Sequence, residues 1–197
     1  MIKRLFDMVF SLTGLFVLAP VFILISVIIK IDTRGPVFFR QVRVGRYGNN
    51  FRIHKFRTMY VESELKGLLT VGSDYRVTRC GKFLRKTKLD ELPQLIDVFL
   101  GNMSLVGPRP EVPEFMDFYP ANIRDKVLSV RPGITDKASI EMVDENEILA
   151  NYDDPRKAYI DVILPIKQAY YIEYVESHNL WLDIEIILLT LKKIVLR

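Results

Sequence analysis

The chain has 197 residues, of which 49% are hydrophobic and 26% are charged, with ten glycines and ten prolines. This size and composition suit one domain with a packed core and exclude a disordered, collagen-like or low-complexity chain. The single cysteine, Cys80, excludes an internal disulfide and a cysteine-based zinc site, which is usual in a reducing compartment.

The net charge of +4 is divided unevenly along the chain. Residues 1–88 hold 17 Lys or Arg and 5 Asp or Glu, a balance of +12, whereas residues 89–197 hold 11 and 19, a balance of −8. Residues 33–61 contain seven basic side chains and no acid. Such a segment is either a solvated basic face or an anion-binding surface, because like charges repel until a counter-charge arrives. We favour an anionic partner.

The first predicted element is the uncharged segment 8–29, which is 22 residues long. As a helix it would measure about 33 Å at ~1.5 Å per residue, enough to cross a hydrocarbon layer of ~30 Å. A cleaved signal peptide is disfavoured, because the apolar part of a signal peptide usually has only ~7–15 residues. The sequence therefore predicts a membrane segment.

Basic residues flank this segment at both ends, so the positive-inside rule places both ends in the cytoplasm. They are Lys3 and Arg4 before it and Lys30 and Arg34 after it. Pro20, near the middle, lacks an N–H, and its ring clashes with the carbonyl four residues earlier, which favours a bend. We predict a re-entrant helix that is broken at Pro20 and enters one leaflet. A kinked transmembrane helix is the alternative.

The rest of the chain is predicted to be a compact, mainly helical domain over residues 33–197, following the membrane segment at 1–32, which makes the fold class α+β. Two β-rich runs, 37–44 and 51–58, are separated by a turn-forming cluster and predict a β-hairpin. Aromatic and apolar residues over 170–196 predict an amphipathic interfacial helix, with a core helix as the alternative.

Residues 89–100 have apolar side chains at helical spacing, with Gly101 after them, and predict a helix with Pro93 in its first turn. Asp90 and Glu91 then fall at the helix N-terminus, where unpaired N–H groups and the helix dipole favour negative charge. An ionised carboxylate close to basic residues suits a nucleophile for phosphoryl chemistry, and a structural N-cap is the alternative.

Two later loops each hold one arginine beside residues that stiffen the backbone. They are residues 107–110 (Gly-Pro-Arg-Pro), with Arg109, and residues 131–133 (Arg-Pro-Gly), with Arg131. A guanidinium group matches phosphate oxygens two at a time, so each loop is a candidate phosphate clamp. For each loop, an ordinary turn with a surface charge is the alternative.

Six blocks in chain order resemble the bacterial sugar transferases, the small monotopic phosphoglycosyl transferases. The blocks are residues 3–7 (KRLFD) with the apolar segment and its Pro20, 35–41 (GPVFFRQ), 55–59 (KFRTM), 89–95 (LDELPQL), 103–110 (MSLVGPRP) and 131–135 (RPGIT). Together they cover nearly the whole chain, and the Asp-Glu pair and the Pro-Arg-Pro turn are the most specific.

The resemblance implies an enzyme that takes a sugar 1-phosphate from a UDP-sugar, releases UMP and places the sugar phosphate on a polyprenol phosphate such as undecaprenyl phosphate. This is the first membrane step of bacterial glycoconjugate synthesis. It implies Asp90 as the nucleophile that forms a covalent phosphosugar intermediate and Glu91 as the residue that helps to hold Mg²⁺. The implied phosphate- and uridine-binding residues are Lys55, Arg85, Arg109 and Arg131.

The resemblance also implies a monotopic protein of the bacterial inner membrane, with its catalytic domain on the cytoplasmic face, the lipid bilayer as a partner and no nucleic acid. We expect the minimal catalytic form, without the multi-span N-terminal region of larger relatives. The donor sugar and the oligomeric state stay open.

Two positions depart from the family pattern. Ala19 stands where many members have Ser, which removes a hydroxyl from the predicted bend. Residues 136–139 are Asp-Lys-Ala-Ser where the family usually has Gly-Trp-Ala-Gln, so we expect a different sugar or different local packing.

Two other classes of function are alternatives. A membrane-anchored nucleic-acid binder would use the basic hairpin and its aromatic side chains, and would need neither Asp90 nor magnesium. A non-catalytic membrane scaffold of the same fold would have no reason to keep the acidic pair.

Overall fold

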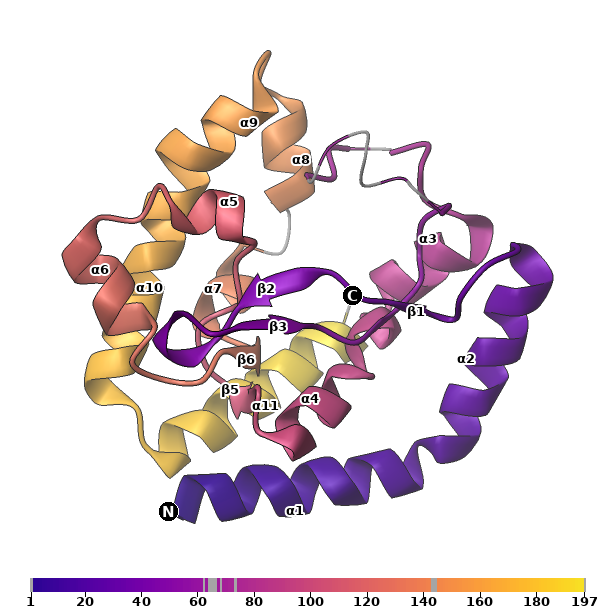
Figure 1. The fold of residues 1–197 in the computed structure, drawn as a ribbon, viewed down its shortest axis with the longest axis horizontal. Coiled ribbons are helices and arrows are strands. Elements are labelled where there is room, and N and C mark those ends of the chain that lie inside the picture. The colour runs from indigo at the N-terminus through magenta and orange to yellow at the C-terminus, as the bar shows by residue number, and fades with distance from the viewer. Residues whose placement is uncertain are drawn as a thin grey trace.

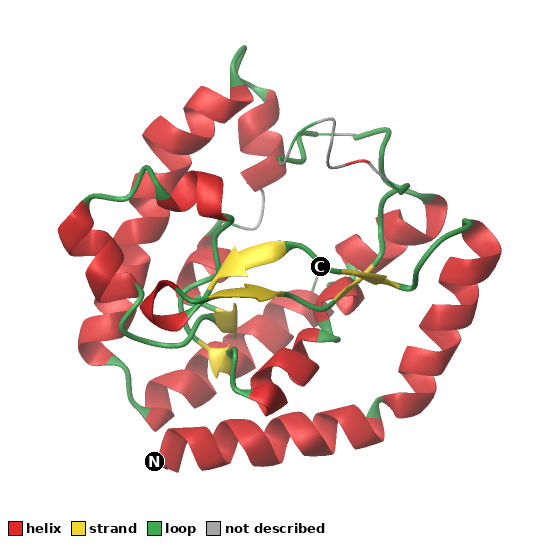
Figure 2. Cartoon of the chain, in the orientation of Figure 1, coloured by secondary structure: helices red, strands yellow, loops and turns green. Residues whose placement is uncertain are grey.

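Helices surround three short pairs of strands in the computed structural model of the chain, which describes residues 2–61, 63, 67, 69–72, 74–142 and 145–196 (Figures 1 and 2). The described helices are α1 (Ile2–Val17), α2 (Ala19–Asp32), α3 (Arg79–Lys86), α4 (Gln94–Leu100), α5 (Pro113–Met116), α6 (Ala121–Val127), α7 (Lys137–Glu141), α8 (Glu145–Ala150), α9 (Pro155–Ala158), α10 (Leu164–Ser177) and α11 (Leu180–Val195). Shorter helical turns are η1 (Arg46–Gly48), η3 (Leu89–Glu91) and η4 (Tyr159–Ile163).

The first two helices run along two sides of the molecule and meet at a bend of 60° (Figure 1). The bend follows Val17, and Pro20 lies in the first turn of α2, where its missing N–H costs no helical hydrogen bond. The predicted break at Pro20 is confirmed. Among the described residues, a single helix with the length and apolar character of a membrane span is absent, and only the bent pair α1 and α2 meets that test jointly.

Both helices pack against the rest of the chain with one face only. On α2, Ile25 and Ile29 are buried in a cluster with Phe56 and Leu84, so α2 covers the base of the hairpin and α3. The other faces of the two helices expose large apolar side chains to the surroundings. These are Ile2, Leu5, Met8, Val9, Phe10, Leu12, Phe16, Val17, Ile23, Leu24, Val27, Ile28 and Ile31.

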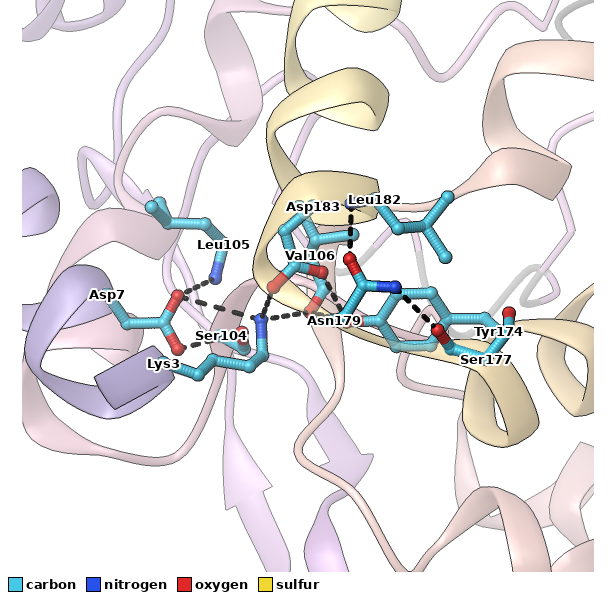
Figure 3. A network of polar contacts seen from close by, with 10 residues as sticks. All are labelled: Lys3, Asp7, Ser104, Leu105, Val106, Tyr174, Ser177, Asn179, Leu182 and Asp183. Atoms are coloured by element: carbon cyan, nitrogen blue, oxygen red, sulfur yellow. Dashed lines mark hydrogen bonds and ion pairs between the residues drawn. The ribbon is translucent and has the colours of Figure 1, made fainter. Parts of the chain in front are cut away.

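The first turns of α1 are joined to the domain by a polar network (Figure 3). The Lys3 ammonium donates to the Asp183 carboxylate at 2.5 Å and to the Val106 carbonyl at 3.3 Å. The buried Asp7 carboxylate accepts the Ser104 hydroxyl at 2.9 Å and the Leu105 N–H at 3.2 Å. These contacts fix the polar end of α1 against β5 (Ser104–Val106) and α11.

The predicted hairpin is confirmed, in two short pieces. Strand β1 (Phe38–Phe39) pairs antiparallel with β4 (Lys55–Phe56), and β2 (Val42–Val44) pairs antiparallel with β3 (Asn50–Arg52). The turn between β2 and β3 contains η1, in which Tyr47 adopts a left-handed conformation with φ of 59°.

A third pair of strands was not predicted. Strand β5 pairs in parallel with β6 (Gly133–Thr135), so the two loops with Arg109 and Arg131 flank one small sheet. The backbones approach closely there, because a Cβ atom on Gly133 would lie 2.1 Å from the Gly107 nitrogen. Only glycine allows this packing.

The C-terminal segment forms two helices where one was predicted over 170–196. Helix α10 ends at Ser177, and the Asn179 side chain caps α11 by accepting the Leu182 N–H at 3.0 Å. Helix α11 has one face in the core and another that is exposed, so the core alternative holds for the first face and the interfacial helix stays a prediction. Its Ile186 is buried, whereas Trp181 is 81% exposed.

Candidate active site

The Asp-Glu pair lies in the 3₁₀ turn η3, ahead of the helix that follows. Lys88, immediately before this turn, has a left-handed backbone with φ of 57°, and Pro93 is the N-cap of α4. The prediction of one helix over 89–100 with Pro93 in its first turn is therefore wrong at its start. Asp90 and Glu91 are presented by a tight turn, which the following proline separates from the regular helix.

Glu91 is held by two cations. Its Oε1 accepts the Lys55 ammonium at 2.8 Å and the Arg109 Nη2 at 2.5 Å, and its Oε2 lies 3.4 Å from the Arg109 Nη1. Burial alone would raise the pKa of the Glu91 carboxyl, but Arg109 and Lys55 outweigh it and hold that pKa well below its usual range. Glu91 is therefore an ionised, oriented carboxylate.

Asp90, unlike Glu91, has no cation bound to its carboxylate among the described residues. Its side chain is buried, and within the described part of the chain its carboxylate accepts no hydrogen bond and forms no ion pair. Burial, and then the negative charge of Glu91, raises the pKa of Asp90. The expectation that a helix terminus favours the charge of Asp90 is not met, because the residue precedes the helix and is shielded from water.

Lys55 reaches Glu91 from strand β4, and the residue before it is pinned in place. The His54 N–H donates to Oδ2 of Asp97 at 2.7 Å, and the His54 Nδ1 lies 2.8 Å from Oδ1 of the same carboxylate. Asp97 is on α4, so this pair ties the strand to the helix that follows the acidic turn. Burial lowers the pKa of Lys55 to about 8, against the opposing effect of Glu91.

Arg85 approaches the acidic pair from α3. Its Nε donates to the Thr58 hydroxyl at 2.9 Å and its Nη1 to the Thr70 hydroxyl at 3.1 Å. Burial lowers the pKa of Arg85, and the charge of Asp90 is the largest effect in the other direction. Three of the four predicted basic residues thus surround the acidic pair.

Arg131 is the exception, and the structure places it in different surroundings. Its Nε donates to the Gly101 carbonyl at 2.8 Å, and the charges that act on it are those of Arg4, Arg46 and Asp7. Arg109 follows β5 and Arg131 precedes β6, so both lie beside the same small sheet, yet their side chains contact different neighbours. The sequence blocks gave no indication of that difference.

Two charged residues near this site, the partly buried Arg43 and the buried Glu111, were not predicted from the sequence. Arg43 donates to the Pro110 carbonyl at 3.0 Å and to the Gln41 side chain at 2.6 Å, and burial lowers its pKa. Glu111 is buried and accepts the Tyr159 hydroxyl at 2.9 Å. Arg43 belongs to the basic run 33–61, but nothing in the sequence distinguishes it from its exposed neighbours.

The departure from the family pattern at 136–139 has a local explanation. The buried Asp136 is the N-cap of α7 and accepts the Ser139 N–H at 2.9 Å and the Ser139 hydroxyl at 2.5 Å. Lys137 points outward and pairs with Glu173 at 2.7 Å. Of the two expectations, different local packing is the one that these contacts support.

The donor set of the acidic pair suits Mg²⁺. Mg²⁺ prefers oxygen ligands and commonly takes one or two protein carboxylates, with waters and substrate phosphates completing the shell. Asp90 and Glu91 are adjacent carboxylates, and Asp90 has unused oxygen lone pairs. A cluster of three possible metal-binding side chains is absent from the described residues, so the remaining ligands would have to come from substrate and water.

The sequence of the chain is similar to those of known proteins. A family model described as bacterial sugar transferase matches residues 1–197. The chain belongs to the bacterial sugar transferase family. The family membership expected from the six sequence blocks is thereby confirmed.

Three relatives show the range of this bacterial sugar transferase family. An undecaprenyl-phosphate glucose phosphotransferase of Komagataeibacter xylinus is 40% identical, over 97% of this chain and 35% of its own length. A UDP-N-acetylgalactosamine-undecaprenyl-phosphate N-acetylgalactosaminephosphotransferase of Aeromonas hydrophila is 37% identical, over 98% of this chain and 43% of its own length. An uncharacterized sugar transferase, EpsL, of Bacillus subtilis (strain 168) is 34% identical, over 98% of this chain and 87% of its own length. The chain thus spans less than half the length of the first two.

Proposed function

We propose that the protein transfers a sugar 1-phosphate from a UDP-sugar to a polyprenol phosphate, undecaprenyl phosphate in a bacterial membrane, and releases UMP. The observation that carries this proposal is the adjacent carboxylate pair, in which Lys55 and Arg109 hold the partly buried Glu91 while the buried Asp90 accepts no hydrogen bond within the described part of the chain. The names of the relatives, which join sugar phosphates to undecaprenyl phosphate, support the same reaction class.

In the first proposed step, Asp90 attacks the phosphorus next to the sugar. A carboxylate oxygen of Asp90 forms the new P–O bond, the bond to the bridging oxygen of the diphosphate breaks, and UMP leaves with that electron pair. Asp90 suits this role because it accepts no hydrogen bond that would have to be broken. Its raised pKa makes it a more basic oxygen than an exposed aspartate.

In the second proposed step, an oxygen of the polyprenol phosphate attacks the same phosphorus. The P–O bond to Asp90 breaks, and the Asp90 carboxylate is regenerated with the polyprenyl diphosphate sugar as product. A covalent intermediate allows a water-soluble donor and a lipid acceptor to use one small site in turn. This suits a cluster in which only one carboxylate is unbonded.

The basic residues around the pair stabilise the charge of the phosphates in both steps. Arg109 contacts Glu91, the charge of Arg85 acts on Asp90, and Lys55 adds a third cation. We propose that Asp90 and Glu91 hold Mg²⁺ when the donor is bound. The ion would supply neutralisation of the diphosphate and of the departing UMP.

We also propose that α1 and α2 form a re-entrant segment, which makes the protein monotopic at the cytoplasmic face of the inner membrane. The large apolar side chains that these helices expose support it, because soluble proteins rarely leave such a continuous apolar surface in water. Their 60° bend would let both ends face one side of the bilayer. The exposed Trp181 on α11 suits the same interface.

One observation argues against the nucleic-acid alternative. That function needs several aromatic rings on the hairpin surface. Tyr47 is exposed, but Phe56 is buried and Phe38 stacks on it with ring centroids 5.6 Å apart. These two rings are part of the contact between α2 and the hairpin.

The test is UMP release from a panel of UDP-sugars by the full chain in nanodiscs, with polyprenol phosphate and Mg²⁺. We expect release from one or two donors, with loss in Asp90→Asn and after addition of EDTA. Single turnover without acceptor should leave the sugar phosphate covalently bound, with a mass increase that maps to the peptide containing Asp90.

Arg79→Gln is the matched control, because Arg79 begins α3, the helix that carries Arg85, but is exposed and forms no ion pair in the described part of the chain. Its activity should stay close to that of the wild type. Folded protein that releases no UMP from any donor would refute the proposed reaction, and release that survives Asp90→Asn would refute the proposed nucleophile.

A further inference from the structure

A second cationic pocket lies at the polar end of α1, apart from the acidic pair. It has a volume of about 170 Å³, and Arg4, Arg46 and Arg131 are among the side chains that line it. These residues come from the first turn of α1, the hairpin turn and the loop before β6, so the fold gathers them from three distant parts of the sequence. His178, at the end of α10, also lines it.

Backbone carbonyls accept the hydrogen bonds of the three guanidinium groups, and the Arg46 guanidinium also lies over the Tyr47 ring, 4.4 Å from its centroid. Arg4 donates to the Val98 and Phe99 carbonyls at 2.6 and 2.8 Å. The remaining two each use the Nε alone: Arg46 donates it to the Ser129 carbonyl and Arg131 to the Gly101 carbonyl, both at 2.8 Å. These contacts fix the direction of each side chain and leave the terminal NH₂ groups of Arg46 and Arg131 without a protein hydrogen bond among the described residues.

The acidic side chains nearest to this pocket are already engaged (Figure 3). Asp183 accepts both the Lys3 ammonium at 2.5 Å and the Tyr174 hydroxyl at 2.7 Å. Asp7 lines the pocket, and its buried carboxylate accepts two hydrogen bonds from β5. Within the described part of the chain, none of the three arginines forms an ion pair.

Like charges at close range repel one another. Burial lowers the pKa of Arg131, and the charges of Arg4 and Arg46 lower it further, against the smaller opposing effects of Asp7 and Tyr47. The Asp7 carboxylate is the one acidic group among the described residues that line this pocket, and it faces four basic side chains there, Lys3, Arg4, Arg46 and Arg131. A bound anion would stabilise this excess of positive charge, and the planar guanidinium group favours phosphate oxygens. The volume of the pocket suits a group of that size but not a whole nucleotide sugar.

We propose that this pocket binds the phosphate group of a phosphate ester, in a site separate from the one that contains Asp90 and Glu91. Its place favours a phospholipid headgroup, because Ile2 and Leu5 beside it are 75% and 65% exposed and continue the apolar surface of α1. That preference rests on the proposed membrane attachment, whereas the charge argument does not. A soluble phosphate ester is the other source of the same chemistry.

The test is calorimetric titration of the full chain in a non-ionic detergent with three probes. They are dihexanoyl phosphatidylglycerol, inorganic phosphate and dihexanoylglycerol, which lacks the phosphate. The variant is Arg46→Gln combined with Arg131→Gln, and the matched control is Arg40→Gln combined with Arg52→Gln. The control removes two exposed charges from the same hairpin region.

We expect the variant to weaken binding of phosphatidylglycerol about tenfold or more, since two charge-assisted contacts are lost. The control and Asp90→Asn should bind as the wild type does, and dihexanoylglycerol should not bind. If inorganic phosphate binds as tightly as the lipid and competes with it, the site is upheld and its ligand is the soluble ester.

Equal binding by the variant and the wild type would overturn the proposal, and so would an equal loss in the control. A variant with both arginines changed to Lys should bind within a fewfold of the wild type, which separates loss of charge from loss of folding. Because Asp90→Asn removes only the proposed chemistry, failure of the proposed function and failure of this site give different results.

Discussion

Two substitutions at the acidic pair make the same chemical change, and the structure predicts opposite effects on stability. Glu91→Gln removes the shared partner of Lys55 and Arg109, which leaves two partly buried cations without a counter-charge. Asp90→Asn removes a carboxylate that burial and Glu91 already disfavour in its ionised form. We therefore expect Glu91→Gln to lower the free energy of unfolding and Asp90→Asn to leave it unchanged or raise it.

The magnitude follows from the two cations separately. The pKa of Lys55 is about 8, so at pH 7 the ammonium can release its proton at a cost of about 1.4 kcal/mol, which limits its share. Arg109 cannot release its proton and loses charge-assisted hydrogen bonds worth about 1.5–3 kcal/mol, with a reduction for its 27% exposed side chain. The sum for Glu91→Gln is about 2–4 kcal/mol.

The assay is urea unfolding of both variants in the same detergent, followed by circular dichroism, in buffer without divalent cations. A pH series adds a second check. The pKa of Lys55 is lowered in the folded state, so its ion pair with Glu91 is present below about pH 8 and is lost above it. At pH 9 wild-type Lys55 is largely neutral, and the deficit of Glu91→Gln should shrink by about 1 kcal/mol. The reasoning fails if Glu91→Gln unfolds at the wild-type urea concentration, or if Asp90→Asn loses as much stability.

Three further substitutions test the fold. Asp7→Ala leaves a buried hydroxyl and an N–H without their acceptor and should cost about 2–4 kcal/mol in urea unfolding, whereas Asp7→Asn, which keeps one acceptor, should cost less. Gly133→Ala places a Cβ atom 2.1 Å from a backbone nitrogen and should lower the free energy of unfolding by at least about 1–3 kcal/mol. In the control Gly14→Ala, the Cβ meets only a leucine methyl group at 3.1 Å, so the thermal midpoint should change little. Asp136→Asn keeps the N-cap of α7 and removes a charge whose pKa burial raises, so its thermal midpoint at pH 7 should equal or exceed that of the wild type. Folded Asp136 holds its proton more tightly than it does in the unfolded chain. The thermal midpoint of the wild type should therefore rise relative to that of Asp136→Asn as the pH falls.

Local chemistry explains which parts of the fold the sequence predicted. Pro20 acts on its own helix through its ring and its missing N–H, so the bend was predictable without knowledge of the rest. The hairpin was predictable for the same reason, since its turn residues and β-rich runs are contiguous. The parallel pair β5 and β6 was not, because its strands are three residues each and 26 residues lie between them.

For the site, too, the local features were predictable from the sequence and the features that depend on distant residues were not. Asp90 and Glu91 are neighbours in the sequence, so the pair was recognisable. Their opposite pKa shifts were not predictable, because these depend on Lys55 and Arg109, which reach Glu91 from a strand and a loop far away along the chain. Arg131 was predicted to bind phosphate beside the acidic pair, but it lines the other pocket. The phosphate-clamp pattern alone does not determine which pocket the side chain lines.

The polar anchor of α1 has a consequence for segment exchange between relatives. Lys3 and Asp7 depend on Asp183, Ser104 and a backbone N–H in the domain for their partners. A chimera that received residues 1–32 from a donor without this pair would leave the Ser104 hydroxyl without its acceptor and the buried Asp183 carboxylate without its cation, with only the Tyr174 hydroxyl still bound to it. The N-terminal helices are thus not an interchangeable module, and a successful graft should carry the acceptor positions with them.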